Sequence, residues 1–320
     1  MAGSSPLTSV SDWLRPQQNR MIVLMGLAGV AMLIPLVANN YVLEVLTNAW
    51  FYAILCLGLN IVVGYAGLLD LGYAAFFAVG AYTTGILTSK FGVNFWLTIP
   101  VAVSCSMLAG LIIGGPTLRL RSDYLAIVTL GFGEIVRIIA RNLEITGGAS
   151  GLIGIDRPSI FGLELSRGIH FYYVFLLLAI LACFISYRLQ NSRLGRAWQY
   201  VREDEDAAEA MGIGRVTVKL YAYVIGAMFG GVAGCFFAAK MTAISPETFT
   251  FSQSVLILLG VVLGGMGKIP GVIIGAFALV LFPEVFRGLG SMRMLIFGIV
   301  MLVIMLYRPE GIWPQKQREV

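Results

Sequence analysis

The sequence predicts an all-α, polytopic membrane protein with one membrane domain. Of its 320 residues, 58% are hydrophobic and only 12% are charged, and the mean hydropathy is +0.86. A soluble chain of this length needs a larger charged surface, whereas lipid accepts an apolar exterior. The chain has roughly ten apolar segments of the length that a bilayer requires, so we expect a bundle of spanning helices, some of them broken or re-entrant.

The N-terminal residues 1–20 are polar, and two arginines precede the apolar run 21–38. This order resembles a signal peptide. However, no clear A-x-A cleavage site follows and apolar sequence resumes at once with 42–63, so we expect an uncleaved first span. The arginines place the N-terminus in the cytoplasm. The membrane domain is expected over residues 21–308.

The remaining spans follow in order along the chain. We expect them at 65–88, 95–115, 124–140, 171–187, 220–243, 255–266, 271–286 and 292–307. The segment 255–266 is short for a straight span, and several glycines and Pro270 surround its end. This composition predicts a half-helix or a re-entrant piece.

The positive-inside rule then assigns a side of the membrane to each connection. The highly charged loop 192–218 and the tail 309–320 fall in the cytoplasm with the N-terminus. The longest external segment is 142–170, whose glycines and short polar residues predict an irregular loop. That loop is either a plain connector or a docking surface or gate for something outside.

Glycines predict close helix packing in the span 220–243. Gly226, Gly230 and Gly234 recur every four residues and leave one helix face bare. Such a face allows another helix to approach closely.

The stretch 64–82 differs because glycines surround Asp70 in apolar sequence, with Tyr73 close by. A broken helix around a membrane-embedded carboxylate is one interpretation, since an ionised side chain at that depth must face protein, water or a partner. Asp70 and Tyr73 are therefore candidates for a translocation pathway. The other interpretation places Asp70 near the cytoplasmic interface, about two turns inside the span.

Two pairs of opposite charges are spaced three residues apart within expected spans. Glu134 with Arg137 and Glu284 with Arg287 each share one helix face. Mutual neutralisation explains both pairs, because a paired charge costs less in a membrane than a lone one. Both pairs also lie toward the external ends of their spans, so a role in an external gate is the alternative.

Catalytic and cofactor motifs are missing from the sequence. The stretch around Lys268 suggests a phosphate loop, but Val262 occupies the required first glycine position and Ile269 follows the lysine. The four cysteines are scattered and there is a single histidine, which gives no pattern for a metal or redox site. No basic tract interleaved with aromatic residues supports nucleic-acid binding. We expect no cofactor in this chain.

The loop 192–218 carries a family resemblance. Asp206, Ala207 and Ala208, followed after three residues by Gly212, resemble the EAA coupling motif of ABC-importer permeases, with Asp in the usual Glu position. Longer matches extend it over nearly the whole chain beyond the first span. They are LGLNIVVGYAGLLDLGYAAFFAVGAY at 57–82, RLRSDYLAIVTLGFGEIVRI at 119–138, TGGASG at 146–151 and SPETFTFSQSVLILLGVVLGGMGKIPGVIIGA at 245–276. Together they resemble the LivM-type permease of branched-chain amino-acid ABC importers.

The resemblance implies a permease subunit in a bacterial inner membrane. It would pair with a LivH-like second permease, two cytoplasmic ATPases that bind ATP and Mg, and an external substrate-binding protein. The loop 192–218 would then form coupling helices, and the residues that the resemblance assigns to ATPase coupling are Arg202, Glu205, Asp206, Ala207, Ala208 and Gly212. Two alternatives stay open. The same machine could carry urea or short amides, or the chain could be an ion-coupled secondary transporter that uses Asp70, Glu134 or Glu284 as a relay.

Overall fold

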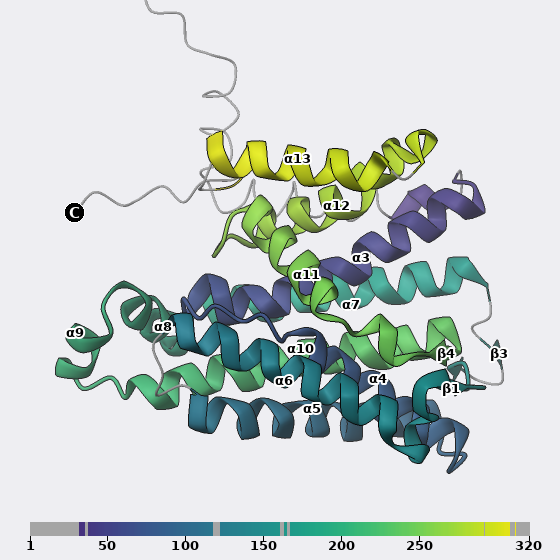
Figure 1. Cartoon of the computed structure of the whole chain (residues 1–320), viewed down its shortest axis with the longest axis horizontal. Helices are drawn as coiled ribbons and strands as arrows, with labels where there is room; N and C mark the ends of the chain where they lie inside the picture. Colours follow the sequence, from purple (N-terminus) through teal and green to yellow (C-terminus); the bar gives the residue numbers. More distant parts are fainter. Residues whose placement is uncertain are drawn as a thin grey trace, which may run out of the picture.

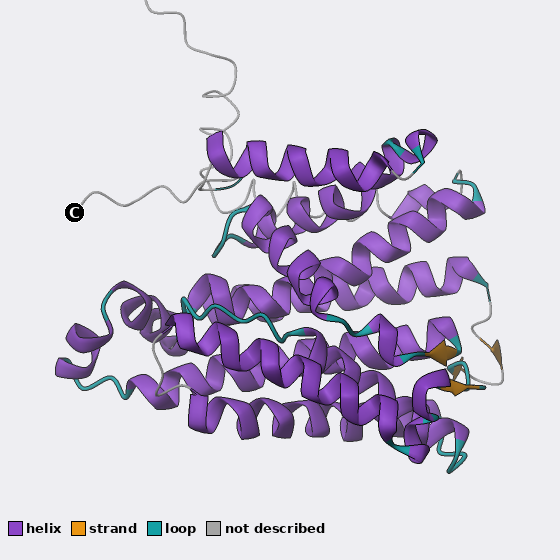
Figure 2. Cartoon of the chain, viewed as in Figure 1, coloured by secondary structure: helices purple, strands orange, loops and turns teal. Residues whose placement is uncertain are grey.

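The computed structural model describes residues 32–35, 38–117, 122–160, 163–164, 167–290, 292–307 and 311. Helices form nearly all of this part, and the short strands lie at one end of the molecule (Figure 2). Within the described ranges, five helical segments are long and apolar enough to cross a membrane: 40–65, 95–117, 168–190, 215–241 and 246–264. The architecture is that of a polytopic helical membrane protein.

Nine main helices make up the bundle in the described part of the chain (Figure 1). They are α3 (Asn40–Asn60), α4 (Ala74–Ser89), α5 (Phe95–Thr117), α6 (Ser122–Asn142), α7 (Gly168–Gln190), α10 (Arg215–Met241), α11 (Phe251–Gly264), α12 (Ile269–Val285) and α13 (Met292–Tyr307). Two short helices, α8 (Arg193–Glu203) and α9 (Glu205–Ala210), project from it. Every expected span from 42–63 onward overlaps one of the nine helices. The first, 21–38, lies mostly outside the described residues, so the count of ten stays a prediction.

The expected span 65–88 is wrong at its start. α3 continues into a π-helical turn, η1 (Ile61–Tyr65), but α4 begins only at Ala74, and the chain between them is irregular. Gly67 has a φ of +71°, which a right-handed helix cannot contain. Hydropathy predicts a continuous span here because most residues of the segment are apolar. The helical backbone is nevertheless interrupted around Asp70.

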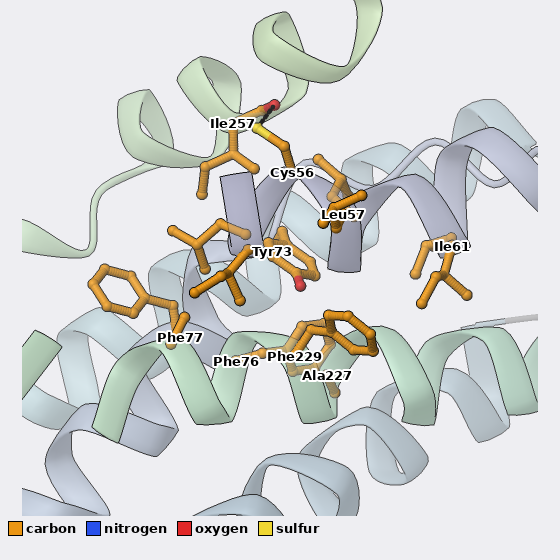
Figure 3. Close-up of a cluster of buried hydrophobic side chains, with 14 of the residues drawn as sticks. Cys56, Leu57, Ile61, Tyr73, Phe76, Phe77, Ala227, Phe229 and Ile257 are labelled. Carbon is orange, nitrogen blue, oxygen red and sulfur yellow. Dashed lines mark hydrogen bonds between the residues drawn. The ribbon is translucent and has the colours of Figure 1, made fainter. Parts of the chain in front are cut away.

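α10 lies at the centre of the bundle and packs against α3, α4 and α5. Its glycine face meets α4 and the segment where α3 continues into η1. A Cβ added at Gly226 would lie 2.6 Å from Cγ2 of Val62, and one added at Gly230 would lie 3.0 Å from Cβ of Phe76. At Gly234 it would collide with the backbone of α4. The aromatic rings of the core, including Tyr73, Phe76, Phe77 and Phe229, fill the space between α3, α4 and α10 (Figure 3).

α11 and α12 form a tight hairpin closed by Gly265 and Gly267, whose φ angles are +106° and +83°. α11 has 14 residues, or about 21 Å at 1.5 Å per residue, which is shorter than the hydrocarbon thickness of about 30 Å. Added Cβ atoms at Gly264 and Gly275 would each collide with backbone of the opposite helix. The glycines therefore let the two helices touch through their backbones.

The ends of the bundle differ in structure. At one end, β1 (Leu152–Ile153) pairs with β4 (Ala243–Ile244) and β2 (Ser159–Ile160) with β3 (Leu163–Glu164), both antiparallel. Three short 3-10 turns, η2 (Glu144–Thr146), η3 (Gly148–Ser150) and η4 (Pro246–Thr248), belong to the same region, and a fourth, η5 (Arg287–Leu289), follows α12. α8 and α9 lie at the opposite end of the long axis (Figure 1). The assignment of these ends to the outside and the cytoplasm stays a prediction.

Candidate functional site: a surface helix pair fastened to a broken helix

The base of α8 is buried in the bundle although the helix lies at its edge. Ser192 caps the helix, because its Oγ accepts a hydrogen bond from the Gly195 N–H at 3.1 Å. The fully buried Trp198 donates from Nε1 to the Val218 carbonyl at 2.7 Å, and its ring lies parallel to that of Tyr65, with 6.4 Å between centroids. α8 is therefore fixed to both α10 and η1.

Arg202 makes the second attachment of α8. Its Nη1 donates to the carbonyl of Gly64 inside η1. Its stem lies over Gly67, where an added Cβ would come within 2.7 Å of the Arg202 Cγ. Gly67 is thus required for its positive φ and for this close contact. Arg202 joins α8 directly to the start of the broken segment.

α9 is held by ion pairs within the chain. Asp204 caps it by accepting from the N–H groups of Asp206 and Ala207, both at 3.0 Å. Glu205 lies 2.6 Å from Nζ of Lys219, a lysine only 2% exposed. Arg215 lies 3.4 Å from Asp206 and 3.2 Å from Glu209. The carboxylates of Glu205 and Asp206 are therefore already paired with bases of α10.

Small and apolar residues are exposed beside the carboxylates of α9 and just after its end. Ala207 and Gly212 are exposed, and Met211 is 83% exposed. Gly212 has a φ of +83° and open space where a side chain would project. Ala208, by contrast, is buried and belongs to the main hydrophobic core. Ala207 and Ala208 therefore do not lie on the same exposed surface. Sequence reasoning missed Met211, although an apolar residue beside this acidic run could have drawn notice.

Asp70 lies inside the break and is enclosed by protein, at 1% exposed. Its Oδ1 accepts from the Gly72 N–H at 2.8 Å, while Oδ2 has no hydrogen-bond partner among the described residues. Neighbouring helices supply the bonds that the broken backbone lacks. The Leu71 N–H donates to Oγ1 of Thr129 in α6 at 3.1 Å, and the Ala74 N–H donates to Oγ of Ser254 in α11 at 2.9 Å.

Tyr73 and Asn60 connect the broken segment to the rest of the bundle. The buried Tyr73 hydroxyl donates to the Gly226 carbonyl of α10 at 2.9 Å. Asn60 accepts from the Gly267 N–H at 2.8 Å, which fastens the α11–α12 turn to the end of α3. Asn60 was missed by sequence reasoning, although a buried amide in an apolar run is a recognisable signal.

The two predicted charge pairs form, each within its own helix region. Arg137 lies 2.8 Å from Glu134 and also 3.3 Å from Glu247 of η4. Arg287 lies 3.5 Å from Glu284, and its guanidinium is 5.0 Å from the ring centroid of Tyr41. Among the described residues, no ion pair joins these two groups to each other or to Asp70.

The structure also contains an ion pair between α10 and α3 that the sequence did not predict. Lys240, near the end of α10, lies 2.6 Å from Glu44 and donates to Asn48 at 2.8 Å. It ties α10 to α3 at the end opposite Lys219.

Fold and site together define a class: a helical, multi-pass membrane protein that presents an anchored pair of short helices at one end of its bundle. The model of the branched-chain amino acid transport system/permease component family matches residues 41–306. The chain therefore belongs to this family of branched-chain amino acid transport permeases.

Relatives agree with this assignment. The chain is 43% identical to the high-affinity branched-chain amino acid transport system permease protein LivM of Salmonella typhimurium (strain LT2), over 93% of this chain and 76% of that protein. It is 42% identical to LivM of Escherichia coli K12 with the same coverage. It is also 23% identical to the permease protein LivH of Escherichia coli K12, over 71% of this chain and 79% of LivH. No solved structure matches.

Proposed function

We propose that this chain is one permease subunit of an ATP-driven importer that moves branched-chain or other neutral amino acids into the cytoplasm by alternating access. ATP and Mg are bound by two partner ATPases, and an external binding protein delivers the substrate. The chain lies in a bacterial inner membrane with both termini in the cytoplasm. Family membership supports the transport role and the substrate class.

One observation supports coupling to an ATPase above the others. The exposed surface of Ala207, Met211 and Gly212 belongs to a helix pair that is tied to the bundle at Trp198 and Arg202. A surface on a mobile loop would move without moving the bundle. Here a push on α8 and α9 reaches η1 through Arg202 and α10 through Lys219.

The second permease is proposed to be a LivH-like chain. The present chain is similar to both LivM and LivH of Escherichia coli K12, and two chains of one fold can form a pseudo-symmetric pair around a shared path. In such a pair, the broken segment with Asp70 and Tyr73 lies where α6, α10 and α11 meet. We assign the change between outward and inward states to this region. Its backbone N–H groups are bonded to side chains of neighbouring helices instead of forming the regular hydrogen bonds of a helix.

The test is reconstitution of this chain with its co-expressed neighbours in liposomes. Leucine-loaded external binding protein should stimulate ATP hydrolysis and leucine uptake, and Gly212→Leu should abolish both without reducing the amount of inserted chain. Gly92→Leu is the control, because Gly92 also combines a positive φ with open space beside it.

Two other outcomes of this experiment would favour the alternative functions. Stimulation with urea and not with leucine would retain the ATP-driven machine and change its cargo. Uptake without any ATPase, abolished by collapse of the ion gradient and by Asp70→Asn, would favour the secondary transporter. The observation that supports that second candidate is Oδ2 of Asp70, which has no hydrogen-bond partner in the part of the chain that the structure describes.

A further inference from the structure

Three arginines at the junction of α7 and α8 have no acidic partner in the described chain. Arg188 lies in the last turn of α7, and Arg193 and Arg196 lie in the first turn of α8. All three are exposed, and none forms an ion pair with a described residue. The bases on the other side of the same loop differ, since Arg215 and Lys219 are neutralised by α9. The junction therefore carries three positive charges that no described acidic side chain pairs with.

Arg188 continues a stripe of apolar side chains on α7. Leu177, Leu181 and Phe184 precede it at helical spacing on the same face and are 67%, 51% and 59% exposed. α7 is apolar and long enough to span a membrane, so we expect this exposed stripe to face acyl chains. The Arg188 guanidinium lies 5.9 Å from the Phe184 ring centroid. The charge thus stands where an apolar lipid-facing surface ends.

Arg193 and Arg196 share one face of α8 with the exposed Tyr200, opposite the buried Trp198. Nη1 of Arg196 donates to the Asn191 carbonyl at 3.3 Å, which holds this side chain beside the end of α7. Arg193 has no hydrogen bond to a described residue, so its guanidinium is free to bind a ligand. Exposed tyrosines at positions 187 and 200 flank the group, as is usual at a membrane–water interface.

We propose that Arg188, Arg193 and Arg196 bind the headgroup of an anionic phospholipid. Guanidinium groups bind phosphate oxygens with paired, charge-assisted hydrogen bonds, and basic side chains next to a span attract anionic lipid. A lipid fits better than an acidic protein surface, because Arg188 directly continues the exposed apolar stripe of a helix that is long enough to span the bilayer. The proposal needs α7 to span the bilayer and is independent of coupling to an ATPase.

The test compares two double variants of the full chain with equal charge change. Arg193→Gln/Arg196→Gln removes part of the proposed site. Arg157→Gln/Arg167→Gln removes two exposed arginines at the strand end of the molecule, which also lack ion pairs to described residues. Each protein is titrated with phosphatidylglycerol and, separately, phosphatidylcholine, and bound lipid is counted by native mass spectrometry.

Unmodified protein should retain phosphatidylglycerol in preference to phosphatidylcholine. Each arginine near a lipid surface changes affinity by about fivefold, so the first double variant should bind phosphatidylglycerol about 30-fold more weakly. Arg188→Gln should weaken binding about fivefold, and the control variant should match the unmodified protein.

Equal phosphatidylglycerol affinity in both double variants would overturn the proposal, as would equal retention of the two lipids by unmodified protein. Loss of a co-purifying protein subunit, with lipid binding unchanged, would also overturn it and assign the arginines to a protein contact. A chain that fails to associate with an ATPase would still yield the lipid result, so the two proposals fail separately.

Discussion

Replacing Arg202 with methionine should separate ATP hydrolysis from uptake. The change removes the guanidinium that donates to the Gly64 carbonyl and keeps an apolar stem over Gly67. A hydrogen bond from a charged donor contributes roughly 1.5–3 kcal/mol net, and an unpaired buried carbonyl costs a similar amount. We take about 2 kcal/mol, which corresponds to about a 30-fold weaker attachment of α8 to η1. The surface of α9 is untouched, so the ATPases should still bind.

The assay measures leucine taken up per ATP hydrolysed in proteoliposomes that hold the complete complex. Arg202→Met should lower this ratio by about tenfold or more and retain most of the hydrolysis. Arg202→Lys can still donate to one carbonyl and should recover part of the ratio. Gln199→Ala changes an exposed residue of the same helix and should leave it unchanged. An unaltered ratio in Arg202→Met, with the variant inserted normally, would refute transmission through this contact.

Three further substitutions test the packing described above. Gly67→Ala forces a positive φ on alanine and places its Cβ against Arg202. The cost is roughly 1–3 kcal/mol, so the melting temperature of this variant should fall. Gly115→Ala is the control, because Gly115 has open space beside it, and should not lower the melting temperature. Gly234→Leu places a side chain against the backbone of α4 and should prevent accumulation of folded protein, while Gly298→Leu at an open position of α13 is tolerated. Lys240→Met removes a tie between α10 and α3, but Glu44 is half exposed and can be hydrated, so thermal unfolding should show a loss of only about 1 kcal/mol.

Hydropathy located the spans because membrane insertion depends on local composition. α5, α7, α10 and α13 lie where the sequence places them, since each is a long apolar run. The i, i+3 charge pairs were equally readable, because helix geometry alone brings Glu134 to Arg137. The glycine repeat in α10 indicated close packing but not the partner helix.

The break at 66–73 could be suspected but not placed from the sequence. Its residues are apolar, and the groups that hold it come from distant parts of the chain, such as Thr129 and Ser254. Asn60 bonds to Gly267 across 207 positions, a contact that no local pattern reveals. The burial of Ala208 could not be predicted for a different reason. A helix of six residues is too short for its buried face to be read from periodicity, so two adjacent alanines looked equivalent when only Ala207 is exposed.

α10 joins both ends of the molecule and gives the proposed coupling a physical route. Its two buried lysines, Lys219 and Lys240, are each paired with a glutamate of another element. Helical rise separates them by about 32 Å, close to the hydrocarbon thickness of a bilayer, so the pairs mark the two ends of the span. Between them the Gly226 carbonyl accepts the Tyr73 hydroxyl. A displacement of α9 reaches Tyr73 along this helix, while a displacement of α8 reaches the same segment through Arg202 and η1. Both routes converge on the broken segment. We therefore expect a tilt of α8 and α9 to move both ends of that segment together. A single attachment would move only one end.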